Sequence, residues 1–387
     1  MKKLLLIILS YIFIFNPVPP LLRIGSVKFL FLLLPLLFTK TYKQSLSDLK
    51  PYIVSYVVLL LYILFRTFIG GYSSIFYTSF IALIESVFIS YIVIKLHDLH
   101  KVDLLKSFFI CGVIAVIISL LSLLFPSFND FIKTYLSLVP DEDVTFYAFR
   151  GFGMGSELTF SYAIVIAVIF SIYLLNYKLN FTLFVLTIFA AIAILINART
   201  GAFVLSIGIL FTITTNIKSS IKYTAILIVL FPFIIYAIRN INPETFDFME
   251  QFYYEVGDIL NGTENARANT AGTLLETQVN YGNSISDMLF GRGISLYTIE
   301  SEQRTDMGYD NQFVYGGICY MFLLANLMFV QFKRSWTNVK MISLFLLLTA
   351  LFVNIKGEFV PTASGYRLIA CLFIYYGTFN NKQLKEK

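Results

Sequence analysis

The sequence predicts an all-α integral membrane protein, and two observations support this fold class. Hydrophobic residues make up 58% of the 387 residues and charged residues only 13%, whereas about 25% of a soluble domain is charged. Apolar runs such as 30–38, 110–125 and 163–175 recur along the whole chain, and about 20 apolar residues in a helix span a bilayer. A soluble enzyme is therefore excluded.

We expect about twelve membrane-spanning helices, one for each apolar window, in a single polytopic membrane domain that covers residues 1–387. The predicted ranges are 4–22, 26–39, 51–69, 75–94, 104–125, 158–176, 180–197, 201–216, 221–238, 312–331, 338–354 and 366–379. A large extracytoplasmic loop is expected at residues 239–311, between the ninth and tenth helices. Connections of this length are usually functional.

The basic residues predict the orientation, because cytoplasmic connections are enriched in positive charge. With both termini in the cytoplasm, the inner segments hold 16 of the 19 lysines together with Arg334. The other nine arginines then fall in outer connections or at outer helix ends: Arg23, Arg66, Arg150, Arg199, Arg239, Arg267, Arg292, Arg304 and Arg367.

This sorting of arginine to the outer side indicates an anionic ligand there. Topology requires positive charge inside and does not require guanidinium groups outside. Arginine has a planar fork that binds phosphate oxygens bidentately, whereas lysine is a strongly hydrated point charge. A lipid-linked diphosphate is a natural ligand. For Arg23, Arg66 and Arg239 we favour the alternative that they extend to the interface or pair with loop carboxylates.

Several short motifs then resemble the O-antigen polymerase and O-antigen ligase superfamily. Residues 197–201 read Asn-Ala-Arg-Thr-Gly at a predicted outer turn, similar to the Arg-Thr-Gly signature of that family. In the large loop, Ala-Arg at 266–267 precedes Leu-Phe-Gly-Arg-Gly at 289–293 and Thr-Asp-Met-Gly-Tyr-Asp-Asn at 305–311. Arg-Gly-Phe-Gly at 150–153 resembles the family's earlier arginine-glycine element. The motifs cover about 30 residues, and their order and side match the family.

The resemblance implies a Wzy-type polymerase of the bacterial cytoplasmic (inner) membrane with a fold like that of the C class of glycosyltransferases. Its substrates would be undecaprenyl-diphosphate-linked oligosaccharides, and its partners membrane lipids, a chain-length regulator and a flippase, with no nucleic acid. The product would be lipopolysaccharide O-antigen, capsule or exopolysaccharide. The leaving diphosphate develops negative charge that preorganised arginines can stabilise, so the reaction would need neither a metal nor another cofactor.

The resemblance assigns diphosphate binding first to Arg199 and Arg267, then to Arg150, and more weakly to Arg292 and Arg304. Three of them have a structural alternative. For Arg199 the alternative is to anchor the turn between two spans, and for Arg267 it is to pair with Glu264. Arg292 lies between two glycines, where backbone flexibility matters more than charge.

The acceptor hydroxyl would benefit from a catalytic base, and the candidates are Asp306, Asp310 and Glu157. Asp310 has the alternative of capping the helix that starts beside Asn311. Glu157 has the alternative of a charge favoured at a helix start by the helix dipole.

Two rival functions stay open. The ligase branch of the family typically carries a histidine in the large-loop motif, where this chain has Asp310 and Asn311, and its histidines, His97 and His100, fall in an inner connection. A flippase for lipid-linked sugars would place charges along a pathway through the membrane. Here Glu85 and Arg66 are the few charges near a predicted span. The polymerase is therefore the favoured hypothesis.

Overall fold

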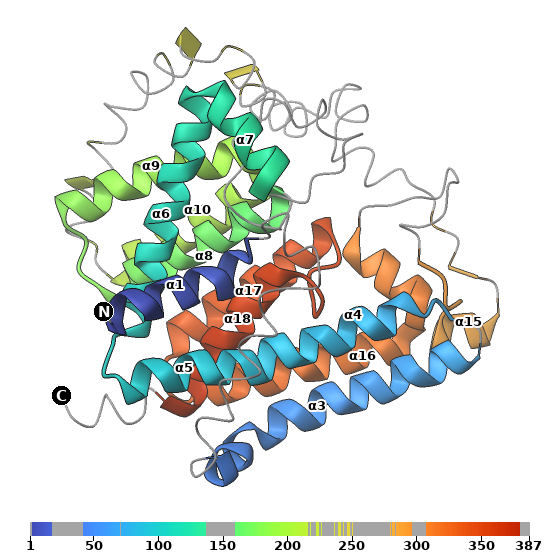
Figure 1. The fold of residues 1–387 in the computed structure, drawn as a ribbon. Coiled ribbons are helices and arrows are strands. Elements are labelled where there is room, and N and C mark those ends of the chain that lie inside the picture. Colours follow the sequence, from blue (N-terminus) through green and yellow to red (C-terminus); the bar gives the residue numbers. More distant parts are fainter. Residues whose placement is uncertain are drawn as a thin grey trace. The chain divides into compact units, whose positions relative to one another are not determined.

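The computed structural model describes residues 2–17, 42–69, 71–136, 159–215, 284–295 and 307–379, with scattered positions between 217 and 282. These described residues form helices joined by short turns, and no strand occurs among them (Figure 1). The chain divides into two compact units. The first contains Met1–Leu32 and Val93–Val256, and the second contains Leu33–Ile92 and Gly257–Lys387.

Four helices in the described part of the chain are long and apolar enough to cross a membrane: Asp48–Phe68, Ser74–Leu99, Leu104–Leu124 and Gly308–Trp336. Helices coincide with ten of the twelve predicted windows, but among the described helices only these four have the length and apolarity of a full span. The window 26–39 and most of 221–238 lie outside the described residues. The fold is thus consistent with a helical membrane protein.

The first unit is built around α8, which is buried along most of its length. Its described helices are α1 (Lys2–Phe15), α6 (Leu104–Leu124), α7 (Pro126–Leu136), α8 (Thr159–Asn176), α9 (Phe181–Asn197) and α10 (Arg199–Thr215). Every residue from position 161 to position 172 is buried, and α6, α9 and α10 all pack on α8. A helix that is apolar on every side is expected in such a core.

Small residues bring the helices of this unit close together. A side chain at Gly112 of α6 would meet Ile169 of α8 at 2.9 Å, and one at Gly208 of α10 would clash with Ser171 of α8. Small residues at helix contacts are typical of membrane bundles, where close backbone approach replaces the hydrophobic effect as the source of stability.

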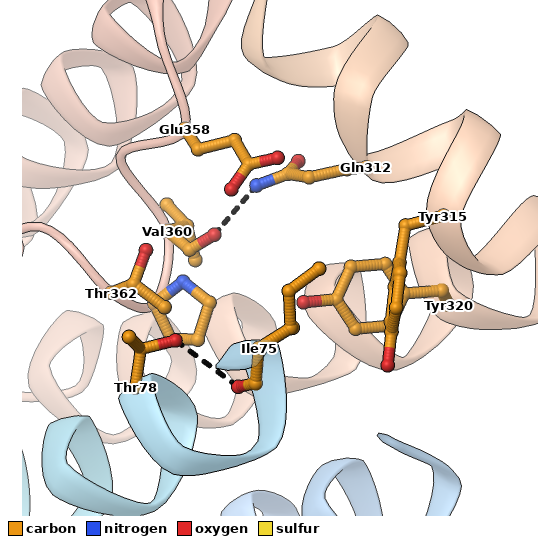
Figure 2. Close-up of a pocket in the computed structure, with 9 residues that line it drawn as sticks. Ile75, Thr78, Gln312, Tyr315, Tyr320, Glu358, Val360 and Thr362 are labelled. Atoms are coloured by element: carbon orange, nitrogen blue, oxygen red, sulfur yellow. Dashed lines mark hydrogen bonds between the residues drawn. The ribbon is translucent and has the colours of Figure 1, made fainter. Parts of the chain in front are cut away.

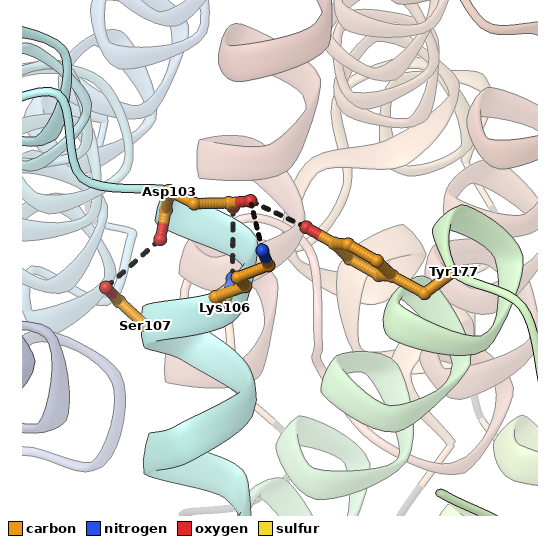
Figure 3. A network of polar contacts seen from close by, with 4 residues as sticks. All are labelled: Asp103, Lys106, Ser107 and Tyr177. Atoms are coloured by element: carbon orange, nitrogen blue, oxygen red, sulfur yellow. Dashed lines mark hydrogen bonds and ion pairs between the residues drawn. The ribbon is translucent and has the colours of Figure 1, made fainter. Parts of the chain in front are cut away.

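Asp103 caps the start of α6 and connects it to α8 (Figure 3). Its Oδ1 accepts a hydrogen bond from the Lys106 backbone N–H at 3.1 Å. Tyr177 directly follows α8, and its hydroxyl donates to Asp103 Oδ2 at 2.7 Å. Lys106 Nζ lies 4.0 Å from the same oxygen. This exposed cluster has a structural role, because an N-cap carboxylate satisfies free N–H groups of the first helical turn.

The second unit is built around α16 (Gly308–Trp336), which packs on helices that precede it and helices that follow it in the sequence. The others are α3 (Tyr42–Phe68), α4 (Ser74–Leu83), α15 (Ile285–Phe290), α17 (Lys340–Lys356), α18 (Ser364–Ile374) and the π-helices η3 (Ile84–Ile89) and η5 (Tyr375–Phe379). α4 and η3 continue without interruption into α5 (Ser90–Leu99). α3 packs against both α4 and α16 (Figure 1). Leu61, Phe322 and Phe329 stay exposed on α3 and α16, as expected of residues that face lipid.

One buried ion pair joins two elements of this unit. Arg367 Nη1 of α18 donates to Glu85 Oε2 of η3 at 2.7 Å, and both side chains are largely inaccessible. Glu85 lies in the one-turn π-helix that interrupts the long helix between Ser74 and Leu99. Isolated π-helical turns are rare in proteins and often occur at functional sites.

Candidate functional site

A small pocket in the second unit lies where one end of α16 meets α4 and the α17–α18 connection. It has a volume of about 280 Å³, including its open mouth. Its lining combines one carboxylate, one carboxamide, hydroxyl groups and apolar side chains. The lining residues are Ile75, Thr78, Gln312, Tyr315, Tyr320, Glu358, Val360, Pro361 and Thr362 (Figure 2).

A pair of buried carboxamides holds the α17–α18 connection against α16. Asn354 Nδ2 donates to Gln312 Oε1 at 2.8 Å, and Gln312 Nε2 donates to the Val360 carbonyl at 2.6 Å. Asn354 Oδ1 accepts from the backbone N–H groups of Phe359 and Val360, both at 3.0 Å. The backbone that follows Glu358 is therefore fixed by side chains from two helices.

Glu358 is the acidic residue of this pocket. Figure 2 shows its carboxylate beside Gln312, on the side of the pocket away from the two tyrosine rings. Its side chain is largely enclosed by protein atoms and only partly exposed. Burial disfavours the charged form of a carboxyl group and raises the pKa of Glu358 to about 7. A carboxyl group that titrates near neutral pH is suited to accept and return a proton.

Two buried tyrosines form the opposite wall. The rings of Tyr315 and Tyr320 meet edge to face with their centroids 5.6 Å apart, and both side chains are buried. The Tyr320 hydroxyl points toward the middle of the pocket (Figure 2). Behind this wall, Tyr62 of α3 stacks on Tyr320 at 6.1 Å and donates to the Gly316 carbonyl at 2.6 Å. The aromatic wall is thus held by α3.

The predicted Phe-Gly-Arg-Gly motif is hydrogen-bonded to a break in α16. Gly317 has a φ of +63° and a non-helical conformation inside this helix, so the carbonyls of the preceding turn need other partners. The Arg292 N–H donates to the Val314 carbonyl at 2.7 Å, and the Gly293 N–H donates to the Tyr315 carbonyl at 3.0 Å. The motif therefore completes the backbone of the turn that supplies Tyr315 to the pocket.

The two glycines of the motif have conformations that other residues rarely adopt. Gly291 has a φ of +73° and Gly293 a φ of +74°. A Cβ atom at Gly291 would clash with the Gly316 backbone nitrogen. The backbone geometry at both positions therefore favours glycine. The Arg292 side chain itself is exposed.

Two other arginines of the predicted outer set have structural contacts. Arg66 is buried and donates from Nη2 to the Gly291 carbonyl at 3.0 Å, so it holds the glycine motif in place. Arg367 is buried in its ion pair with Glu85. Neither arginine is placed as a free outer-face group, and the partner of Arg66 is a backbone carbonyl and not the interface or loop carboxylate of the alternative that we favoured.

Among the predicted diphosphate ligands, Arg199 and Arg292 are described. Arg199 is the first residue of α10, directly after the tight turn that ends α9 at Asn197. It is partly exposed. Gly201 of the same motif packs closely on α8, because a Cβ atom there would lie 2.8 Å from the Ala163 side chain. Arg150, Arg267 and Arg304 lie outside the described residues.

Among the predicted bases, only Asp310 is described, while Asp306 and Glu157 lie outside the described residues. Asp310 is in the first turn of α16, where a negative charge is favoured by the helix dipole. Its Oδ1 accepts a hydrogen bond from the Tyr281 hydroxyl at 2.8 Å. Partial burial, with the hydrogen bond and charge of Asp310, raises the pKa of Tyr281 to about 12. Asp310 stays a candidate base.

Sequence reasoning missed Glu358. It is the only acidic residue in the connection 357–363, directly before the apolar Phe359 and Val360. A carboxylate next to buried residues in a short connection is the signal that would have identified it, because such a group is costly to bury without a role. His97, which was expected in an inner connection, lies instead in α5, where it is buried and its Nδ1 lies 2.8 Å from the Val93 carbonyl.

Comparison with family models, with curated proteins and with solved structures finds no match to this chain. The resemblance to the O-antigen polymerase and ligase superfamily therefore rests on the sequence motifs.

Proposed function

We propose that this protein polymerises undecaprenyl-diphosphate-linked oligosaccharide repeat units at the outer face of the bacterial cytoplasmic membrane. In the proposed reaction, a hydroxyl at the nonreducing end of one repeat unit attacks the anomeric carbon of a glycan on a second lipid diphosphate. The bond from that carbon to the diphosphate breaks, and the lipid diphosphate leaves with the electron pair. The protein is then a metal-independent glycosyltransferase.

The observation that supports this proposal best is the contact between the glycine motif and the pocket. The Gly293 N–H donates to the carbonyl of Tyr315, and the Tyr315 side chain lines the pocket that contains Glu358. A motif that resembles those of glycan polymerases and a pocket with acid-base and hydroxyl groups therefore share one turn of α16. In the proposed topology this turn is on the same side as the loop 239–311.

The leaving diphosphate is assigned to arginines in this proposal. Arg199 and Arg267 are the first candidates, followed by Arg150, Arg292 and Arg304. Guanidinium groups that are already oriented toward the departing oxygens stabilise the charge that develops in the transition state. The exposed side chain of Arg292 next to the pocket turn is compatible with this role.

The Glu85–Arg367 ion pair of the second unit favours a glycosyltransferase over a transporter. A transporter is expected to have ionisable groups along its pathway. Glu85, the carboxylate inside a predicted span, is bound to Arg367 at 2.7 Å, so its charge is compensated within the bundle. The ligase alternative differs in its acceptor, and the experiment below separates the two.

The test is a turnover assay with purified protein in liposomes that contain fluorescent lipid-linked repeat units. We expect a ladder of products that differ by one repeat unit. The Arg267→Lys variant is expected to lose most of this activity, because a bidentate contact depends on the planar fork and not on charge alone. Translocation of the labelled lipid without a ladder would establish a flippase. Transfer only to an added lipid A core acceptor would establish a ligase.

A further inference from the structure

We propose that the Glu358 pocket binds the hydroxyl-bearing edge of the acceptor's terminal sugar and that the Glu358 carboxylate accepts the proton of the attacking hydroxyl. This inference rests on the proposed glycosyl transfer and assigns the acceptor side of that reaction, for which no residue is established.

The groups of the pocket match a sugar and not a diphosphate. A carboxylate accepts hydrogen bonds from sugar hydroxyls but repels phosphate oxygens, so the donor's leaving group is excluded from this position. Thr78, Thr362 and Tyr320 add hydroxyl groups to the lining, and Pro361 adds an apolar surface. Hydroxyls beside apolar and aromatic surfaces are the usual lining of a site for a polar small molecule.

The size of the pocket limits what enters it. The volume of about 280 Å³ includes open space at the mouth, and the enclosed part is far smaller than the roughly 300–1,000 Å³ of a site for a whole drug-sized ligand. It therefore has room for a single hydroxyl group at the edge of a terminal sugar, while the sugar ring and the rest of the repeat unit stay outside. That is the arrangement required for an acceptor that presents a single hydroxyl to the donor.

The position of Glu358 is fixed by the carboxamide pair. Asn354 Oδ1 binds the two backbone N–H groups that follow Glu358, and Gln312 binds both Asn354 and the Val360 carbonyl. Gln312 and Asn354 are themselves buried. A base held in place before the substrate binds needs no reorganisation during the reaction. Gln312 and Asn354 are thus positioning residues, and Glu358 is the catalytic residue.

The proton balance of the step is simple. As the acceptor oxygen forms its bond to the anomeric carbon, its proton moves to a Glu358 carboxylate oxygen, which gives a neutral carboxylic acid. The bond between the anomeric carbon and the diphosphate oxygen breaks, and that oxygen keeps the electron pair. Glu358 then returns the proton to solvent. Asp310 lies outside the lining of this pocket and binds Tyr281, so it is less suited to this role.

The experiment measures the initial rate of polymer formation between pH 5.5 and 8.5 for three proteins: wild type, Glu358→Gln and Asp130→Asn. Asp130 is an exposed carboxylate on α7 and serves as the matched control. Among the described residues that line the pocket, the titratable groups besides Glu358 are Tyr315 and Tyr320 of α16, and a tyrosine ordinarily titrates near pH 10. A change of rate near neutral pH that Glu358→Gln abolishes is therefore attributable to the carboxyl group.

We expect the wild-type rate to rise about tenfold per pH unit below neutral pH and to level off above it, because only the carboxylate accepts a proton. Glu358→Gln is expected to lose about a hundredfold or more of the rate with no such pH dependence, and Asp130→Asn to follow wild type. A Glu358→Gln rate within threefold of wild type would overturn the inference and leave the polymerase proposal standing. A wild-type rate that does not change with pH would also overturn the inference, and this measurement requires no variant. A wild-type protein that forms no polymer at any pH would overturn both.

Discussion

Gln312 and Asn354 exchange hydrogen bonds between their carboxamides, with Asn354 Nδ2 2.8 Å from Gln312 Oε1 and Gln312 Nε2 3.2 Å from Asn354 Oδ1. The two residues come from different helices, α16 and α17, and both are buried. Because Asn354 also binds the backbone after Glu358, this pair connects the packing of two helices to the geometry of the pocket.

Replacing Asn354 by alanine is expected to destabilise the protein strongly. The change leaves the buried N–H groups of Phe359 and Val360 without their acceptor, and each lost partner costs about 1–3 kcal/mol. We expect a clear decrease of the melting temperature in detergent. Asn176→Ala is the control, because Asn176 is exposed and its Nδ2 binds a carbonyl of its own helix. Equal melting temperatures for both variants would show that the carboxamide pair does not hold the pocket.

Glu358 is expected to make stability depend on pH. Its pKa is raised by burial from 4.5 to about 7 in the folded protein, so folding favours the protonated form. Relative to Glu358→Gln, the wild type is therefore most stable below about pH 4.5. It loses on the order of 3 kcal/mol as the pH rises to about 7. The measurement is the difference in melting temperature between the two proteins from pH 5 to pH 8. A difference that stays constant would contradict the raised pKa.

Variants at Gly291 and Arg292 are expected to separate the structural role of the glycine motif from its chemical role. Gly291→Ala is expected to lower the melting temperature, because a Cβ atom would clash with Gly316 and the backbone has a φ of +73°. Arg292→Lys is expected to leave the melting temperature unchanged, since the side chain is exposed, and to reduce polymer formation mildly. If Gly291→Ala melts like wild type, the motif does not support the break in α16.

The Glu85–Arg367 pair is expected to behave as a coupled unit. Removing one partner of a buried ion pair costs about 3–5 kcal/mol, whereas replacing both by apolar residues is often neutral. We therefore expect Glu85→Leu and Arg367→Met to melt well below wild type and the double variant to recover most of the loss. If the losses of the single variants simply add in the double variant, the two side chains are not coupled.

Hydropathy predicted the positions of most described helices, because a helix that spans a membrane needs a long apolar run. The predicted window 104–125 coincides with α6 at Leu104–Leu124, where Asp103 supplies a cap that is visible in the sequence. The break at Gly317 was not predicted, since a glycine pair changes hydropathy little, and its stability depends on hydrogen bonds from a loop more than 20 residues earlier.

The pocket could not be predicted in the same way, because it is assembled from three segments far apart in the chain. Thr78, Gln312 and Glu358 come together only through helix packing, and their types do not form a local motif. The predicted arginine and carboxylate candidates came instead from the sorting of basic residues between the two sides, from motif resemblance and from a predicted helix start. For Arg66 and Arg367, the sequence could not show that each has a buried partner.

The most direct test of the proposed function counts two products of one reaction. In liposomes with purified protein and a single lipid-linked repeat unit, we expect one lipid diphosphate to be released for each new glycosidic bond, because the diphosphate is the leaving group of every transfer. The measurement pairs quantitation of free lipid diphosphate with the length distribution of the labelled polymer. A polymer that grows without equivalent lipid diphosphate release, or release without new glycosidic bonds, would contradict the account.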